Sequence, residues 1–328
     1  MDRGGDTVNS VMDEATRQDA RVDAAAAPQW TVQGERGSQS LLRLMTALSL
    51  RLGRRASRRV LPLINVYYTL FGGAARRASR QYLRRVLGRE PVFGDGLRHV
   101  GTFAATIHDR LYLLHDRFDL FAVEIEGGNL IAEALASGAG AFLMGAHYGS
   151  FEILRAVGRQ YLTRPVVMVM YERNARKVNA ALASINPRAA PEIIALGHPD
   201  SMLKVHERLE SGAIVGMLVD RAIGSDTTAD IPFLGVPAPF PTGPFRMAAA
   251  LRRPVFFMAG AYLGDNRYRV RFVPLADFSV VPARGRAAAV GDAVRRFAVL
   301  VEAECRSAPY NWFNFYDFWN PHGGAPDG

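Results

Sequence analysis

The sequence contains a single cysteine, so the chain cannot form an internal disulfide bond. This composition is typical of proteins from reducing compartments. Cys305 lies in a segment with helical periodicity, and we interpret it as a buried core thiol. No cluster of cysteine and histidine has the spacing of a metal site, so we predict no metal.

Several motifs of other enzyme classes are also missing. The chain has no glycine-rich phosphate loop and no dinucleotide-binding fingerprint, and we predict no cofactor. No serine lies in a Gly-x-Ser-x-Gly elbow, which argues against a serine hydrolase. The start of the chain is acidic and lacks an apolar core segment, so we predict no signal peptide.

Acidic residues are absent between residues 36 and 89, where arginine is frequent, although the whole chain has a formal charge of only +9. Leu44, Leu48 and Leu52 share one helical face of this region. Other faces carry the arginines, among them Arg43, Arg51, Arg54 and Arg58. The apolar run over residues 60–75 is shorter than the roughly 20 residues that a membrane-spanning helix needs.

We therefore predict an amphipathic region that lies on an anionic membrane surface, with its arginines against the lipid head groups. A helical hairpin packed on the core, with solvated arginines, is the alternative. Nucleic acid is not an expected partner, because phosphate would leave the leucine stripe unused.

Apolar strand patterns alternate with helical patterns through the rest of the chain. Strands are expected at residues 141–145, 165–170, 193–196, 213–219, 255–261 and 268–273. Helices are expected at residues 100–115, 130–135, 151–159, 175–183, 202–209, 244–251 and 287–305. Such alternation predicts an α/β fold with a mixed, mostly parallel central sheet flanked by helices, preceded by the basic amphipathic helical region.

The segment 141–152 carries the clearest chemistry. An apolar strand leads to His147, Ser150 is placed to cap the next helix, and Glu152 falls in the first turn of that helix. Functional groups gather at this edge of open α/β sheets. A carboxylate at this spacing can reach the imidazole and hold one tautomer, which leaves the other nitrogen to take a proton. A histidine and a glutamate five residues apart also occur together by chance.

The block His147-Tyr-Gly-Ser-Phe-Glu152 resembles the His-x4-Asp/Glu block of the bacterial lipid A biosynthesis (late) acyltransferases, within the glycerolipid acyltransferase-like superfamily. A second resemblance is the pair Asp220-Arg221 after an apolar strand. A third is the segment 231–244, which contains Gly235 and Gly243. The three blocks follow in the family's order, and the resemblance runs from about residue 41 to residue 319.

The resemblance implies transfer of a fatty acyl chain from a thioester to a lipid hydroxyl, with His147 as general base and Glu152 as the group that orients it. Backbone amides near Gly149 or an arginine are expected to stabilise the oxyanion. The expected substrate-binding residues are Arg173, Asp220, Arg221, Gly235 and Gly243. Each of these residues also has an alternative explanation. Arg173 could be a solvated loop arginine, Asp220 and Arg221 could form a structural ion pair, and Gly235 and Gly243 could be ordinary turn glycines.

The aromatic segment 309–319 is expected either to close the core or to line the acyl or acceptor groove. We predict residues 1–33 as a disordered tail, residues 34–98 as the membrane-association region and residues 99–328 as the acyltransferase domain.

The expected partners are acyl carrier protein as donor, a lipid or glycolipid acceptor such as a lipid A precursor, and an anionic membrane. The expected location is the cytoplasmic face of the inner membrane, as a peripheral protein. Two other functions stay open: a lysophospholipid or glycerolipid acyltransferase that uses acyl-coenzyme A or acyl carrier protein, and a non-catalytic carrier-binding protein.

Overall fold

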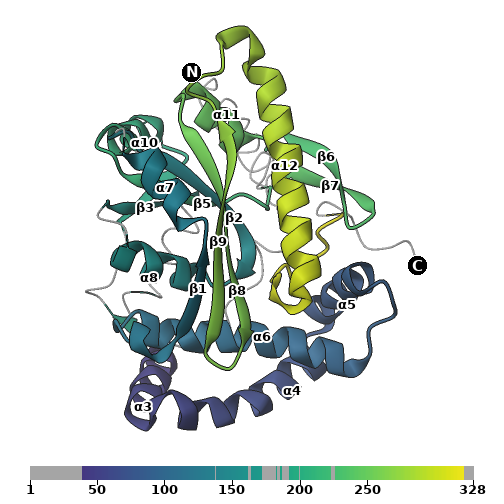
Figure 1. The fold of residues 1–328 in the computed structure, drawn as a ribbon. Coiled ribbons are helices and arrows are strands. Elements are labelled where there is room, and N and C mark those ends of the chain that lie inside the picture. The colour runs from purple at the N-terminus through teal and green to yellow at the C-terminus, as the bar shows by residue number, and fades with distance from the viewer. Residues whose placement is uncertain are drawn as a thin grey trace, which may run out of the picture.

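The computed structural model describes residues 39–136, 138–161, 164–171, 182, 185–186, 192–198, 200–222 and 226–320. Arg173 lies outside the described residues, as does the helix expected over residues 175–183 except for residue 182. Figure 1 shows a twisted central sheet with helices on both faces, which confirms the predicted fold class.

The central sheet has seven strands in the order β1-β9-β8-β2-β5-β3-β4. All neighbouring pairs are parallel except β8 and β9, which form a long antiparallel hairpin. The strands are β1 (Ala122–Glu126), β2 (Ala141–Gly149), β3 (Val166–Tyr171), β4 (Glu192–Leu196), β5 (Ile214–Leu218), β8 (Pro254–Gly264) and β9 (Arg267–Asp277). The six predicted strands therefore all exist, because their apolar runs fill a sheet that is buried on both faces.

Alternate residues of the central strands enter two hydrophobic cores. One core joins the sheet to α10 (Ser201–Glu210), α11 (Gly243–Ala250), α12 (Arg286–Ser307) and α5 (Gly73–Leu87). The other joins it to α6 (Phe93–Leu113), α7 (Gly128–Leu135) and α8 (Phe151–Tyr161). Within β2, Phe142 and Met144 point to the first core and Leu143 to the second.

Two structures were not expected from the sequence. The first is the edge strand β1, whose alternating glutamates hide a short strand signal. The second is a hairpin of β6 (Thr228–Phe233) and β7 (Val236–Pro241), in a segment where no strand was expected. The segment is rich in proline, which is tolerated here because a two-stranded hairpin has free edges where a missing N–H costs little.

The N-terminal helices lie beyond one end of the sheet. In Figure 1, α6 runs across the end of β8 and β9, and α3 (Gln39–Ser57) and α4 (Leu61–Phe71) lie on the far side of α6. A short 3-10 turn, Arg58–Val60, joins these two helices. None of the described helices combines the length and the apolar character that a membrane crossing requires.

A buried ion pair fixes α3 to the core. The Arg54 guanidinium donates to both carboxylate oxygens of Asp109 on α6, at 2.8 and 3.0 Å, and the Tyr268 hydroxyl donates to Asp109 at 2.8 Å. Asp109 is fully buried and Arg54 nearly so. A buried carboxylate needs such partners, because leaving it unpaired costs several kcal/mol.

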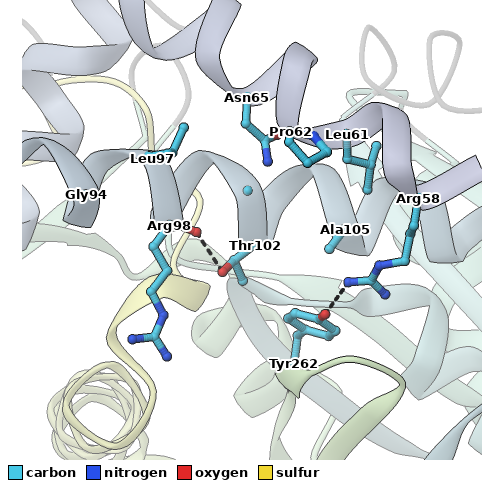
Figure 2. Close-up of a pocket in the computed structure, with 11 residues that line it drawn as sticks. Arg58, Leu61, Pro62, Asn65, Gly94, Leu97, Arg98, Thr102, Ala105 and Tyr262 are labelled. Carbon is cyan, nitrogen blue, oxygen red and sulfur yellow. Dashed lines mark hydrogen bonds between the residues drawn. The ribbon is translucent and has the colours of Figure 1, made fainter. Parts of the chain in front are cut away.

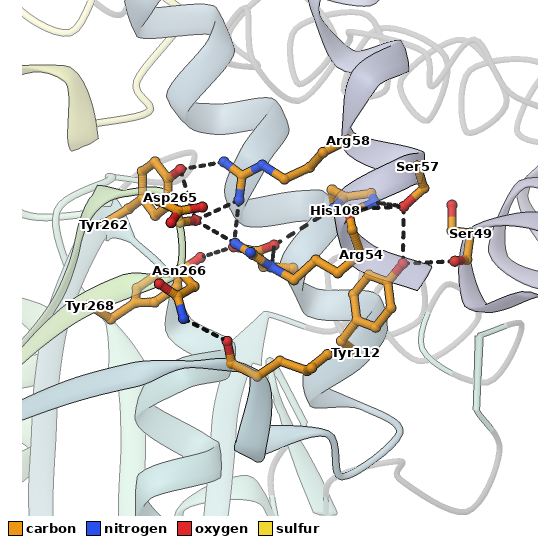
Figure 3. Close-up of polar contacts among 12 residues, drawn as sticks. Ser49, Arg54, Ser57, Arg58, His108, Tyr112, Tyr262, Asp265, Asn266 and Tyr268 are labelled. Atoms are coloured by element: carbon orange, nitrogen blue, oxygen red, sulfur yellow. Dashed lines mark hydrogen bonds and ion pairs between the residues drawn. The ribbon is translucent and has the colours of Figure 1, made fainter. Parts of the chain in front are cut away.

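Arg58 belongs to the same cluster. It lies 3.5 Å from Asp109 and donates to the Tyr262 hydroxyl of the β8–β9 hairpin (Figure 3). The expectation that Arg54 faces lipid head groups is therefore wrong, because its side chain is buried against Asp109. Arg54 and Arg58 lie one helical turn apart on a face that packs on α6 and the β8–β9 hairpin, and Arg58 also lines the pocket between α4 and α6.

Candidate active site

His147 and Asp220 lie side by side because their strands are adjacent and parallel. The register pairs Gly145 of β2 with Leu218 of β5, and the Val219 amide donates to the Gly145 carbonyl at 2.8 Å. Two residues further along each strand, the chain reaches His147 and Asp220. The pair thus stands at the carboxyl edge of the sheet, where ligands bind in open α/β folds.

The two side chains form a short hydrogen bond. His147 Nδ1 lies 2.6 Å from Asp220 Oδ1, and the His147 backbone amide donates to Asp220 Oδ2 at 3.1 Å. Because an ionised carboxylate only accepts, Nδ1 carries the proton in this pair. No described residue forms a hydrogen bond with Nε2, and the His147 side chain is 29% exposed. Nε2 can therefore accept a proton from a bound substrate.

Asp220 is fully buried and is held by further donors. Asn314 Nδ2 donates to Oδ2 at 2.9 Å, and the Trp312 indole N–H donates to the same oxygen at 3.2 Å. Burial by itself would raise the pKa of Asp220. The interaction with His147, the positive charge of Arg221 and the Asn314 hydrogen bond outweigh it, so the pKa lies well below its usual value. Asp220 is therefore ionised at neutral pH.

The environment keeps the imidazole neutral. Burial lowers the pKa of His147, and the positive charge of Arg221 lowers it further, while Asp220 offsets only part of this. A histidine with a pKa below about 6.5 is unprotonated at neutral pH. His147 therefore has the protonation state that a general base needs.

Arg221 fastens the C-terminal segment beside this pair. Its Nε donates to Asn314 Oδ1 at 2.6 Å, and a terminal nitrogen donates to the Phe313 carbonyl at 3.1 Å. Its guanidinium carbon lies 5.5 Å from the centre of the Tyr316 ring. Asp220 and Arg221 thus lie at the predicted edge, and they serve the imidazole and the C-terminal segment, respectively.

The aromatic segment after α12 forms one wall of the site. The Phe313 amide donates to the His147 carbonyl at 2.7 Å, and Trp312 forms a β-bridge with Tyr148. Trp312 is fully buried, and its ring centre lies 4.7 Å from that of Phe318. The segment therefore closes the core, as one of the two predictions stated, and also supplies hydrogen bonds to Asp220.

Trp312 and Asn314 are site residues that the sequence analysis missed. The concentration of aromatic residues pointed to this segment. Nothing in the sequence indicated that Asn314, nearly a hundred residues after Asp220, would donate to its carboxylate.

Glu152 has different partners from those predicted. Its carboxylate accepts from Arg155 at 2.9 and 3.0 Å and lies 3.6 Å from Arg159, and it is almost completely buried. No hydrogen bond joins it to His147 among the described residues. The expectation that Glu152 orients the imidazole is therefore corrected: Asp220 occupies that position.

The physical reason is the turn between the two residues. Gly149 has a φ of +61°, and a Cβ there would lie 1.9 Å from the Gly260 carbonyl oxygen, so only glycine fits. The turn starts α8, on which the carboxylate points along the helix toward residues three and seven positions later. The predicted cap is confirmed, since Ser150 Oγ accepts from the Ile153 amide at 3.2 Å.

The two candidate glycines lie in a turn and at the start of a helix. Gly235 is exposed in the β6–β7 turn with a φ of +85°, after Leu234 with a φ of 52°, a pair typical of a two-residue hairpin. Gly243 is the exposed first residue of α11. The contact of this hairpin with the site comes instead from Phe233, whose ring centre lies 5.2 Å from that of Trp312.

Within the part of the chain that the structure describes, no group of three or more His, Cys, Asp or Glu side chains could hold a metal ion. The chemistry that the described geometry supports is proton transfer at a neutral, oriented imidazole. The pair alone does not identify the reaction, because the same arrangement occurs in many enzyme classes.

Comparison with known families identifies the class. The model of the family described as bacterial lipid A biosynthesis acyltransferase matches residues 89–320, which include the whole sheet, His147 and Asp220. No curated protein matches the chain. The family match covers well over half of the sequence, and it agrees with the three motif blocks. The chain therefore belongs to the bacterial lipid A biosynthesis acyltransferase family.

Proposed function

We propose that this protein transfers a fatty acyl chain from an acyl-carrier-protein thioester to a hydroxyl of a lipid A-like glycolipid, with His147 as general base and Asp220 as its orienting partner. The observation that carries the proposal is the 2.6 Å contact between the buried Asp220 carboxylate and the partly exposed imidazole. Family membership supplies the reaction class, and the pair supplies the base that the reaction requires.

In this reaction the acceptor hydroxyl donates its proton to His147 Nε2 while its oxygen attacks the thioester carbonyl. The tetrahedral intermediate collapses, and the bond from carbon to sulfur breaks. The imidazolium then returns the proton to the departing thiolate, so that the products are an ester and a thiol. Asp220 stabilises the imidazolium that forms, in the manner of the aspartate in a catalytic triad.

The oxyanion also requires donors. The Ser150 amide is already bound to the Gly260 carbonyl at 2.8 Å. The first amides of α8, at Phe151 and Glu152, have no acceptor within their own helix. We assign them the oxyanion, since a helix N-terminus favours negative charge.

The carrier protein fits the charge of the chain. Carrier proteins are strongly acidic, and α5 exposes Arg76 and Arg77 at its surface. Long-range attraction of this kind mainly speeds association. Reversal of both charges is expected to raise KM for acyl carrier protein and to leave KM for acyl-coenzyme A unchanged. A preference for coenzyme A thioesters in the unaltered protein would instead favour a glycerolipid acyltransferase.

The acceptor is a membrane lipid, so the site needs access to a membrane surface. The outer sides of α3 and α4 carry exposed apolar residues: Leu48, Leu52, Leu63, Val66, Tyr67 and Leu70, each at least 40% exposed. Exposed arginines such as Arg51 and Arg55 lie beside them. We propose that this apolar face enters the head-group region of the inner membrane from the cytoplasmic side.

The experiment that tests the function compares the lipids of cells that produce the active protein with those of cells that carry the His147→Ala variant. Mass spectrometry is expected to show one glycolipid that differs by the mass of one acyl chain. Identical lipid profiles, with both proteins present at equal levels, would refute the proposal.

A further inference from the structure

A cavity separate from the His147–Asp220 pair lies between α4, α6 and the β8–β9 hairpin. The cavity opens widely to solvent, and its volume is about 430 Å³. Figure 2 shows α4 on one side, α6 along the floor and Tyr262 on the opposite wall. The polar lining residues are Arg58, Asn65, Arg98, Thr102 and Tyr262.

The charges of the lining favour an anion. The cavity is lined by two arginines and by no carboxylate. Arg58 donates to the Tyr262 hydroxyl and, at 2.6 Å, to the Asp265 carbonyl, and it lies 3.5 Å from the Asp109 carboxylate, so its charge is only partly available to a ligand. Arg98 is exposed, has no acidic partner among the described residues, and packs on the Tyr310 ring at 4.5 Å. A phosphate is the anion that arginine binds best, through charge-assisted hydrogen bonds.

The lining also offers unused acceptors. Asn65 Oδ1 has no hydrogen-bond partner, although a buried polar atom normally has one, and a ligand reaches this buried oxygen when the amide group turns into the pocket. The Thr102 hydroxyl donates its proton to the Arg98 carbonyl at 2.9 Å, which leaves its oxygen able to accept (Figure 2). A ligand that satisfies these atoms must bring hydrogen-bond donors as well as an anion.

The surroundings of the cavity are apolar. Leu63 of α4 is 74% exposed, and Val92 and Phe93 at the start of α6 are 64% and 58% exposed. Leu61, Pro62 and Leu97 belong to the lining itself. An apolar rim around a cationic cavity suits an amphiphile, whose chains cover the rim, better than a free phosphate in water.

We propose that this cavity binds the head group of an anionic glycerophospholipid that carries hydroxyl groups, as phosphatidylglycerol does. The phosphate meets the arginines, the head-group hydroxyls donate to Asn65 and Thr102, and the acyl chains lie along α4. The site extends the membrane association proposed above: it makes one lipid a specific ligand and places it beside α6, whose Phe103 ring lies 5.1 Å from that of Phe313 in the wall of the active site.

The test is titration calorimetry of the full chain with dihexanoyl-phosphatidylglycerol as monomers, without substrates or vesicles. We expect saturable binding of one lipid per chain. Arg98→Ala and Asn65→Asp are each expected to weaken it about tenfold, since the first removes a charged donor and the second adds a negative charge. Arg246→Ala, which removes an exposed arginine from α11, is the matched control and is expected to change nothing.

Three results would overturn the site. They are equal effects of Arg98→Ala and Arg246→Ala, equally tight binding of dihexanoyl-phosphatidylcholine, which lacks the hydroxyls, and equally tight binding of inorganic phosphate. The measurement involves no turnover, so an inactive protein that still binds this lipid would refute only the proposed reaction. Loss of vesicle binding with intact binding of the monomeric lipid would refute only the membrane-surface proposal.

Discussion

Asp220→Asn is the substitution that most sharply tests the structure of the site. The Asp220 carboxylate accepts four hydrogen bonds: three reach Oδ2, from the His147 amide, Trp312 and Asn314, and one reaches Oδ1, from His147 Nδ1. An asparagine has one acceptor and one donor end. Because three donors meet at Oδ2, the amide oxygen will take that position, and the NH₂ group will face His147 Nδ1.

That orientation forces the wrong tautomer on the imidazole. Nδ1 must accept a hydrogen bond from the amide, so the proton moves to Nε2, which can then no longer act as a base. We expect kcat to fall by about 10²- to 10⁴-fold, the usual scale for loss of a positioned base or of its orienting aspartate. The buried charge is lost while the shape of the side chain is kept, so the free energy of unfolding is expected to fall by about 1–3 kcal/mol, as for Glu152→Gln, and thermal denaturation is used to show that the variant is folded.

The pH profile gives a second signature. The pKa of His147 is lowered, so activity is full above about 6.5 and is lost as the pH falls through the lowered pKa. Asp220 is the charge that raises this pKa, so its removal is expected to move the acidic limb of kcat/KM to still lower pH. A kcat within threefold of the unaltered protein and an unmoved limb would refute the assignment.

Glu152→Gln is the matched control, because it also converts a buried carboxylate to an amide. Glu152 binds Arg155 and not His147, so its loss is expected to reduce the free energy of unfolding by about 1–3 kcal/mol. The acidic limb of the pH profile is expected to stay in place. A limb that moves as it does for Asp220→Asn would restore Glu152 as the orienting group.

Two further predictions concern stability and the membrane face. Burial lowers the pKa of His99 to about 4, although its hydrogen bond to the Trp312 carbonyl partly opposes this, so the unfolded chain binds more protons between about pH 6.5 and pH 4. The free energy of unfolding is therefore expected to fall by about 3 kcal/mol as the pH drops through that window. Urea titrations at several pH values should show that this free energy depends less on pH in His99→Gln than in the unaltered protein. An equal pH dependence in the two proteins would contradict the prediction. Leu63→Asp is expected to weaken binding to anionic vesicles about tenfold or more in co-sedimentation, because the aspartate removes apolar contact and adds repulsion. Val280 is 76% exposed on another part of the surface, and Val280→Asp is expected to leave vesicle binding unchanged. Equal losses of binding in the two variants would contradict the proposed membrane face.

The sequence allowed much of the fold to be predicted, because each central strand is an apolar run and each covering helix has a buried stripe. It failed where local patterns mislead. The proline-rich β6–β7 segment gave no pattern that we recognised as strands, and the short, glutamate-rich β1 gave too weak a pattern to be recognised. Both elements are stabilised by their neighbours and not by local preference.

The candidate site was predicted in part for the same reason. His147 and Asp220 follow separate apolar strands, so their place at one edge could be predicted. Their contact depends on β2 and β5 being neighbours, a fact of tertiary structure. Glu152, five residues from His147, was the obvious partner in the sequence, but the turn at Gly149 directs it to Arg155. Sequence proximity was therefore a poor guide to the partner of the imidazole.

The central claim is that His147 catalyses acyl transfer from a carrier-bound thioester to a lipid hydroxyl. The most direct measurement is a single-turnover reaction of the purified protein with acyl carrier protein bearing a labelled acyl chain and a lipid A-precursor glycolipid, followed by mass spectrometry of the lipid. We expect one added acyl chain with the unaltered protein and at least a hundredfold slower addition with folded His147→Ala. Equal rates with the two proteins would contradict the account, as would a lipid that gains no acyl chain.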